Sequence, residues 1–142
     1  MKSLKLKLIA FVLPLIALSA CSLNDNDNFC SIEDRGFVSQ VTGADTVVAG
    51  EELVLEVTFK ITADCGSFIG FYNSSSYPKN IYPRIQYNDD GCDGCATANI
   101  VLTEEYTFSQ ETAGEYQLKF LSGVDSSNEA QYITKTITVT AE

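Results

Sequence analysis

One segment of the chain, residues 53–61, alternates between apolar and mostly polar side chains. The apolar positions are Leu53, Leu55, Val57, Phe59 and Ile61, and between them stand Val54, Glu56, Thr58 and Lys60. Successive side chains of a β-strand point to opposite faces of the sheet, so this period puts every apolar side chain of the first set on one face. A helix would scatter them around its surface. The segment therefore predicts a strand with one buried and one solvated face.

The same alternation recurs through the rest of the chain after residue 36. Strands are predicted at 37–41, 46–48, 53–61, 68–72, 81–87, 100–108, 116–120 and 133–139. Turn-forming runs at 48–50, 73–76, 89–91, 112–114 and 125–128 separate most of them. Beyond the apolar N-terminal run, no stretch of ten residues shows a helical period. Seven or eight strands joined by short turns predict an all-β fold, a single antiparallel β-sandwich over residues 36–142.

Two residues in the predicted strands, Pro83 and Lys135, indicate sheet edges. Pro83 has no backbone N–H, which indicates that the strand at 81–87 is an edge strand. Lys135 falls on the apolar side of the last strand. Its aliphatic stem is therefore expected to cover the core at a sheet edge while its ammonium group reaches outward.

The segment ETAGEYQLKFLS, residues 111–122, resembles the start of the penultimate strand in bacterial immunoglobulin-like and fibronectin-III-like domains. In those domains a turn ending in Ala-Gly precedes an alternating strand that begins with Tyr. In immunoglobulins a Tyr at this corner bonds back to the preceding loop, and the resemblance implies the same for Tyr116. The chain has no Trp for an immunoglobulin core, and Leu118 stands where the Cys of the inter-sheet pair would be. The resemblance is therefore to the immunoglobulin-like architecture, over residues 36–140.

The first 21 residues have the order of features of an export signal. Three lysines precede an apolar run from 8 to 18, which is shorter than the ~20 residues that a helix needs to cross a bilayer. The run ends in Leu18-Ser19-Ala20-Cys21, which resembles the lipobox of bacterial lipoproteins. The resemblance implies that Cys21 is alkylated with diacylglycerol, that residues 1–20 are removed and that the new amino group is acylated. The alternatives are an ordinary secreted protein with a structural Cys21, or an uncleaved anchor.

Residues 21–35 are then expected to form the lipidated N-terminus and a flexible tether. The segment from Ser22 to Asn28 has one apolar residue, Leu23, and can bury too little surface to order itself. The acyl chains would tie the protein to a membrane. By resemblance to the sorting rules of Gram-negative lipoproteins, Ser22 after the lipidated Cys favours the outer membrane, on either its periplasmic or its surface face.

Charge excludes some partners of the predicted mature chain. Removing residues 1–20 takes away three of the nine basic residues and none of the nineteen acidic ones, which leaves six bases, nineteen acids and a formal net charge of −13. Such a surface repels nucleic acid and anionic headgroups, so no nucleic-acid partner is expected. The chain contains no His, which removes the commonest general base and metal ligand.

Four cysteines follow Cys21, and an even number in an exported chain predicts disulfides. They are Cys30, Cys65, Cys92 and Cys95. Antiparallel pairing of the strand after Cys30 with the strand before Cys65 would bring those two residues together. The favoured pairing is therefore Cys30–Cys65, with Cys92–Cys95 closed locally. The main alternative joins Cys65 to Cys92 or Cys95.

The stretch Gly91-Cys92-Asp93-Gly94-Cys95 has the CxxC spacing of thiol–disulfide oxidoreductases and of one half of a zinc ribbon. Redox motifs sit at helix N-termini, whereas this one is predicted in an acidic loop that disfavours a thiolate. Cys30 and Cys65 lack the paired spacing that would complete a zinc site, and the nearby carboxylates lack the EF-hand spacing. We expect no metal and no cofactor. A thiol- or metal-binding protein using Cys92 and Cys95 stays the lesser alternative.

The loop from 72 to 82 contains the candidate ligand contacts. Tyr72, Tyr77 and Tyr82 stand there among Asn and Ser, and aromatic faces suit sugar stacking or protein contact. The alternative is that they cover the edge of the core. The predicted function is a non-catalytic binding or adhesion domain of a membrane-anchored cell-envelope lipoprotein, with protein or glycan as partner. A structural accessory subunit of an envelope complex is the alternative, and no spacing of acids or nucleophiles indicates an enzyme.

Overall fold

The computed structural model describes residues 29–90 and 94–142, and within these ranges the chain forms nine strands and no helix. The strands are β1 (Phe29–Arg35), β2 (Phe37–Thr42), β3 (Thr46–Val48), β4 (Glu52–Ala63), β5 (Gly66–Asn73), β6 (Lys79–Asp90), β7 (Thr97–Ser109), β8 (Gly114–Val124) and β9 (Ala130–Thr140). Seven or eight were predicted, and β1 is the strand that the alternation did not reveal. The described part of the chain has no helix long and apolar enough to cross a membrane.

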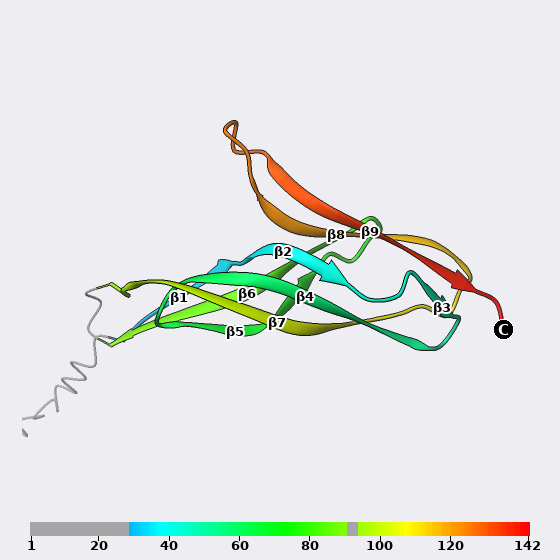
Figure 1. The fold of residues 1–142 in the computed structure, drawn as a ribbon, viewed down its shortest axis with the longest axis horizontal. Coiled ribbons are helices and arrows are strands. Elements are labelled where there is room, and N and C mark those ends of the chain that lie inside the picture. Colours follow the sequence, from blue (N-terminus) through cyan, green and yellow to red (C-terminus); the bar gives the residue numbers. More distant parts are fainter. Residues whose placement is uncertain (1–28, 91–93) are drawn as a thin grey trace, which may run out of the picture.

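The strands lie in two layers (Figure 1). Sheet B has the order β2-β4-β7, and sheet A has the order β1-β6-β8-β9-β3 with β5 also paired to β6. The start of β1 lies at one end of the molecule, and β3 and the C-terminus lie at the other (Figure 1). The all-β sandwich predicted from the alternation is confirmed.

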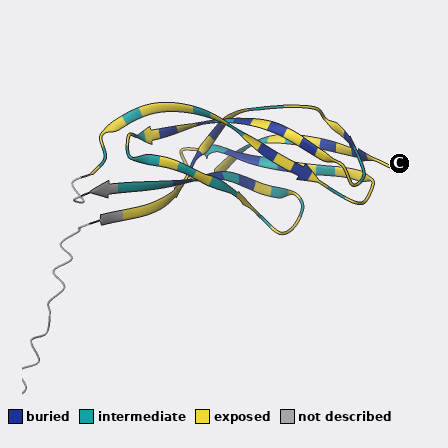
Figure 2. Cartoon of the chain, turned by 90° about the horizontal axis from the view of Figure 1, so that it is seen from below, coloured by how far each residue is buried: buried dark blue, intermediate teal, exposed yellow. Residues whose placement is uncertain are grey.

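The core lies between the two sheets, and the alternation places it. Every apolar residue of the 53–61 pattern is buried on the inner face of β4. Sheet A contributes Ile81, Ile85, Leu118, Phe120, Ile137 and Val139. Figure 2 shows the result as bands of buried and exposed residues along the strands. Each fully buried side chain of this size contributes about 1.5–3 kcal/mol relative to exposure.

Gly36 is the point at which the chain crosses from sheet A to sheet B. The strand before it, β1, pairs with β6, and the strand after it, β2, pairs with β4. A Cβ at position 36 would lie 3.0 Å from the Cβ of Pro83, so any other residue would have to push Pro83 aside, whereas glycine fits this close crossing as it is. Residues 29–35, which the composition placed in the tether, therefore belong to the sandwich. Residues 1–28, with Cys21, lie outside the described part.

The prediction that Pro83 marks an edge strand is wrong, because β6 has neighbours on both sides. β5 pairs along one edge of β6, while β8 pairs with residues 79–81 and β1 with residues 84–90 along the other. Pro83 lies where β8 gives way to β1, and its carbonyl accepts a hydrogen bond from Gly36 N, 2.7 Å away. Because the N–H and C=O of a strand residue point to the same side, the N–H that Pro83 lacks would point to the place where β8 ends and β1 begins. No ladder hydrogen bond is therefore lost.

The sequence predicted wholly antiparallel sheets, and this prediction is wrong for two pairs of strands. β6 pairs with β8, and β3 with β9, in parallel. β7 ends at the same end of the sandwich where β6 begins, so β8 starts from that end and runs in the direction of β6.

Two predictions about single side chains are confirmed. The Tyr116 hydroxyl donates to the carbonyl of Thr112 at 2.8 Å, which closes the corner before β8. Lys135 is on the inner side of β9, beyond the short partner strand β3. Its ammonium group reaches out to the Gly43 carbonyl at 3.0 Å and to the Asp45 carboxylate.

Candidate functional site

The outer face of sheet A is set by the alternation in β6. Ile81, Pro83 and Ile85 are buried on the inner face, so Tyr82 and Arg84 point outward from the same strand. Register partners share a face, which adds Tyr72 opposite Tyr82. The site is built from these residues and from their neighbours on β1, β8 and β9.

Tyr72 and Tyr82 form a stacked pair. Their ring centroids lie 4.6 Å apart and their planes differ by 14°. Tyr72 is 42% exposed, because β5 has no second partner strand among the described residues and leaves its outer edge open. The pair therefore presents one free aromatic face at the edge of the sheet.

Tyr77, the third predicted contact, does not join them. It packs against Tyr116 with ring centroids 4.9 Å apart, and its hydroxyl accepts a hydrogen bond from Gln110 at 2.8 Å. Burial and the neighbouring Tyr116 raise the pKa of Tyr77. Tyr77 packs against the edge of the core, as the alternative describes, and its role as a ligand contact stays a prediction.

The outer face continues from Tyr82 towards β8 and β9. Phe120 of β8 is the register partner of Ile81 and points inward, so its neighbour Leu121 points outward. Leu121 is only 3% exposed, although it is not part of the main core. Its partner on β9 is Tyr132, and the Lys119 ammonium lies 4.9 Å from the centre of the Tyr132 ring. Beyond this point the β8–β9 hairpin stands away from the rest of the molecule (Figure 1).

Two arginines lie on the outer face one row further along β6 from Tyr82. Arg84 donates from Nε and Nη2 to the two carboxylate oxygens of Glu33, at 2.6 and 2.8 Å. This hydrogen-bonded pair lowers the pKa of Glu33 and raises that of Arg84. Arg35 is the register partner of Arg84, and its guanidinium makes no hydrogen bond or ion pair with any residue in the described ranges.

Gly70 leaves open space beside the arginines. It is opposite Arg84 in the β5–β6 ladder, and a Cβ built there would have no neighbour within 4 Å. Its φ of +122° is a conformation that side-chain-bearing residues rarely adopt. The space directly over Gly70, next to Arg84 in the ladder, is therefore not filled by a side chain.

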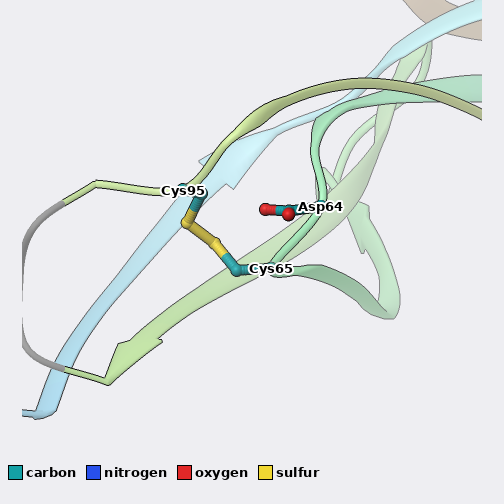
Figure 3. Close-up of side chains that lie close together, drawn as sticks. All are labelled: Asp64, Cys65 and Cys95. Carbon is teal, nitrogen blue, oxygen red and sulfur yellow. A yellow bond between two sulfur atoms is a disulfide. The ribbon is translucent and has the colours of Figure 1, made fainter.

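The cysteines form a different pairing from the one favoured by the sequence. Cys65 is bonded to Cys95, with Cα atoms 5.6 Å apart (Figure 3). The predicted pairs Cys30–Cys65 and Cys92–Cys95 are therefore wrong. Gly36 sends the chain of Cys30 into the other sheet, whereas the β4–β7 ladder continues through Asp64 and Ala96 to Cys65 and Cys95. The Cys30 side chain and all of Cys92 lie outside the described part.

Asp64 lies beside this disulfide (Figure 3). Its carboxylate and the two sulfur atoms are close enough together to share a metal ion. Both sulfur atoms are consumed by their mutual bond, however, and a metal needs thiolates. The group is a structural bridge with an adjacent acid, and the CxxC dithiol of the thiol- or metal-binding alternative is not formed.

Sequence reasoning found Tyr72 and Tyr82 but missed Arg35, Arg84, Lys119 and Tyr132. The alternation in β6 put Tyr82 and Arg84 on one face, but only the strand order brings β1 and β9 beside them. Comparison of the chain with protein-family models, with curated proteins and with solved structures gave no match. Function is therefore argued from this geometry.

Proposed function

We propose that this protein is a cell-envelope lipoprotein that binds a protein or glycan partner through the outer face of sheet A, without catalysing a reaction. Residues 1–20 are removed, Cys21 carries the lipid, and the sandwich is the binding module. The lipobox-like end of the N-terminal run supports the anchor. The stacked, exposed Tyr72–Tyr82 pair is the observation that supports the binding face.

We also propose that the sandwich is immunoglobulin-like. The hydrogen bond from Tyr116 to Thr112 supports this, because it is the corner bond of that fold. The strand orders β2-β4-β7 and β6-β8-β9 support it too, since they match A-B-E and C-F-G. The parallel pairing of β6 with β8 departs from the antiparallel immunoglobulin sheets.

An exposed tyrosine pair suits binding better than stability. A stacked aromatic pair contributes only about 0.5–1.5 kcal/mol beyond its buried area, and Tyr72 keeps much of its ring in water. Aromatic side chains with a polar tip dominate recognition surfaces because they bury much area with little loss of conformational freedom. The open edge of β5 gives a ligand access to this ring.

The anchor would leave this face free. The chain enters the sandwich at Phe29, at the end opposite the C-terminus (Figure 1). Residues 21–28 span at most about 29 Å when extended. The lipid would therefore hold the end with the Cys65–Cys95 bridge near the bilayer. The strands would then extend away from the membrane, and the outer face of sheet A would face sideways rather than towards the bilayer.

The anchor is tested by mass spectrometry of the intact protein from cells, with and without reductant. The expected mass is that of residues 21–142 plus acyl groups, and Cys21→Ser should abolish both acylation and cleavage. A chain that begins at another residue, or that lacks acyl mass, would disprove the anchor.

The binding face is tested by retention of the detergent-solubilised protein on immobilised envelope glycan and envelope protein fractions. Tyr72→Ala with Tyr82→Ala should abolish retention on one of them. Phe37→Ala is the matched control, because Phe37 is 43% exposed on the outer face of sheet B. Equal retention of both variants would overturn the proposed face. Co-purification with a fixed set of subunits that survives the double substitution would instead indicate the structural accessory role.

A further inference from the structure

We infer that the outer face of sheet A binds an acidic glycan, with one sugar ring on Tyr72 and an anionic group of the same oligosaccharide on Arg35 and Arg84. This inference rests on the proposed function and names the ligand class. It depends on where the few basic residues of the chain are placed.

Arg35 and Arg84 are directly opposite each other in the β1–β6 ladder. The next pair along, Gly36 with Pro83, is joined by a hydrogen bond, so the arginines occupy a non-hydrogen-bonded site. Cα atoms at such sites are only about 4.5 Å apart and their side chains are closest. Like charges in this position destabilise a sheet.

The structure neutralises only one of the two charges. Glu33 holds the Arg84 guanidinium through two hydrogen bonds, which fix its position and leave Nη1 without a bond to Glu33. Arg35 has no acidic partner in the described ranges. An unfavourable local arrangement without compensation is expected where a site serves binding. An oxyanion between the two guanidinium groups would supply the compensation, since arginine is suited to bind carboxylate, sulfate and phosphate.

In so acidic a chain, a pair of neighbouring arginines is unusual. Only six of the basic residues follow residue 20, against nineteen acids. Among the side chains that the structure describes, three of these bases, Arg35, Arg84 and Lys119, point outward from sheet A, together with two acids, Glu33 and Glu115. On the outer face of sheet B, Lys60 is accompanied by Glu52, Glu56 and Glu105. Within the described side chains, an anion therefore meets more bases than acids on the sheet A face and more acids than bases on the sheet B face.

The tyrosines and the arginines lie in neighbouring rows of sheet A but on different strands, with Tyr72 on β5, Tyr82 and Arg84 on β6, and Arg35 on β1. The row Tyr72–Tyr82 and the row Gly70–Arg84 are two residues apart along the strands, which is about 6.8 Å. The free face of Tyr72 is open at the sheet edge, and nothing lies within 4 Å of a Cβ built at Gly70. Arg35 lies two strands across the sheet from Tyr72, about 10 Å away, so the ligand is an oligosaccharide rather than a single sugar. One ring stacks on Tyr72, and the carboxylate or sulfate of a further sugar reaches the arginines over Gly70.

The test is titration of the solubilised protein with tetragalacturonate, with a sulfated galactan oligosaccharide, and with methyl-esterified tetragalacturonate as the neutral match. Binding of either anionic probe is expected, with affinity that falls as salt rises and is at least tenfold weaker for the ester. Arg35→Gln should weaken anionic binding at least tenfold without loss of folding, because Arg35 makes no side-chain bond in the described ranges. Lys60→Gln removes the same charge from the other sheet and should change affinity less than twofold.

Three results would overturn the inference: equal affinity for the ester and the acid, equal losses from Arg35→Gln and Lys60→Gln, or no binding of either anionic probe at millimolar concentration. Its failure is distinguishable from failure of the proposed function. If retention on an envelope fraction still requires Tyr72 and Tyr82 while the acidic probes do not bind, the binding face stands and the acidic ligand is wrong.

Discussion

The two sheets have inner faces of the same kind and outer faces of different kinds. Phe59 from sheet B and Phe120 from sheet A are both fully buried, and Tyr106 connects the sheets by packing on Phe71 and Phe120. Outside, sheet B carries threonines and glutamates, with the hydroxyls of Thr58 and Thr103 2.9 Å apart. The outer face of sheet A carries tyrosines and most of the outward-pointing bases.

Each outer face also holds one like-charge pair of register partners, and the signs differ. Glu56 is opposite Glu105 on sheet B, and Arg35 is opposite Arg84 on sheet A. A pair of acids is unremarkable in so acidic a chain, and Glu56 accepts a hydrogen bond from Thr42. A pair of arginines runs against the composition. The comparison shows that packing makes the two inner faces alike, whereas the outer faces are free to differ. The proposed function accounts for the difference by assigning binding to sheet A.

The largest expected effect tests whether the inner faces are equivalent. Phe59→Ala and Phe120→Ala should each lower the free energy of unfolding by about 3–5 kcal/mol, because each leaves a cavity in the core. Urea denaturation measures this, and the exposed Phe37→Ala should cost less than about 1 kcal/mol. A mild effect of Phe120→Ala alone would show that sheet A does not pack on sheet B as described.

Removing the disulfide should weaken sheet B before sheet A. The Cys65–Cys95 bridge closes a loop with a sequence separation of 30, worth about 3–4 kcal/mol in the chain-entropy model. Cys65→Ser with Cys95→Ser should cost that amount, and amide hydrogen exchange should rise most at the start of β7. Faster exchange in β8 and β9 than in β7 would contradict the assignment of this bridge to the β4–β7 ladder.

Alkaline pH tests the contact between the two inner faces. Burial, and to a lesser degree Tyr77, raises the pKa of Tyr106 from 10.0 to about 12, and its hydroxyl donates to Asn73 of sheet A at 2.6 Å. The folded state therefore holds this proton more tightly than the unfolded chain. Its contribution is complete below pH 10 and is lost between pH 10 and 12, by about 2–3 kcal/mol.

Urea denaturation from pH 8 to 12 measures this loss. Tyr106→Phe should flatten the decline, leaving the smaller part that the raised pKa of Tyr77 causes in the same direction. Parallel declines of the variant and the unmodified protein would show that Tyr106 is not the source.

The smallest expected effect sharpens the contrast between the outer faces. Tyr72→Ala with Tyr82→Ala should cost about 0.5–1.5 kcal/mol for the lost stacking, in addition to the buried area that the two rings give up, and Thr58→Val with Thr103→Val about 1 kcal/mol or less. Only the first pair of substitutions should abolish ligand retention. A stability loss above about 3 kcal/mol for the tyrosine variant would make that pair structural and remove the contrast.

The period of two was sufficient to predict the core and every strand except β1, because burial on one face is a local property of the chain. The neighbours of β6 were not predictable in this way. Pro83 indicated an edge by the usual rule, but its missing donor falls at the gap between β8 and β1, which only the strand order shows. The same applies to Arg35, whose importance depends on the non-local pairing of β1 with β6.

The disulfide shows how the crossing of the chain at Gly36 invalidates a prediction about distant cysteines. Cys65 and Cys95 continue the register of Ala63 with Thr97 across the β4–β7 ladder, so the pairing follows once those strands are known to be neighbours. The prediction of Cys30–Cys65 assumed that the chain before β2 stays in sheet B. The crossing at Gly36 depends on close contact with Pro83, which is distant in sequence.

The crossing at Gly36 also decides how the molecule carries mechanical load. A force applied to the chain at Phe29 acts along β1. Because the hydrogen bonds between β1 and β6 lie perpendicular to the strands, they share this shear force rather than breaking one after another. The proposed ligand is held by β1, by β6 and by β5, which pairs with the other edge of β6. Tension between the proposed anchor and the ligand would therefore pass through the β1–β6 and β5–β6 ladders of sheet A, and the hydrophobic core lies outside the line of force.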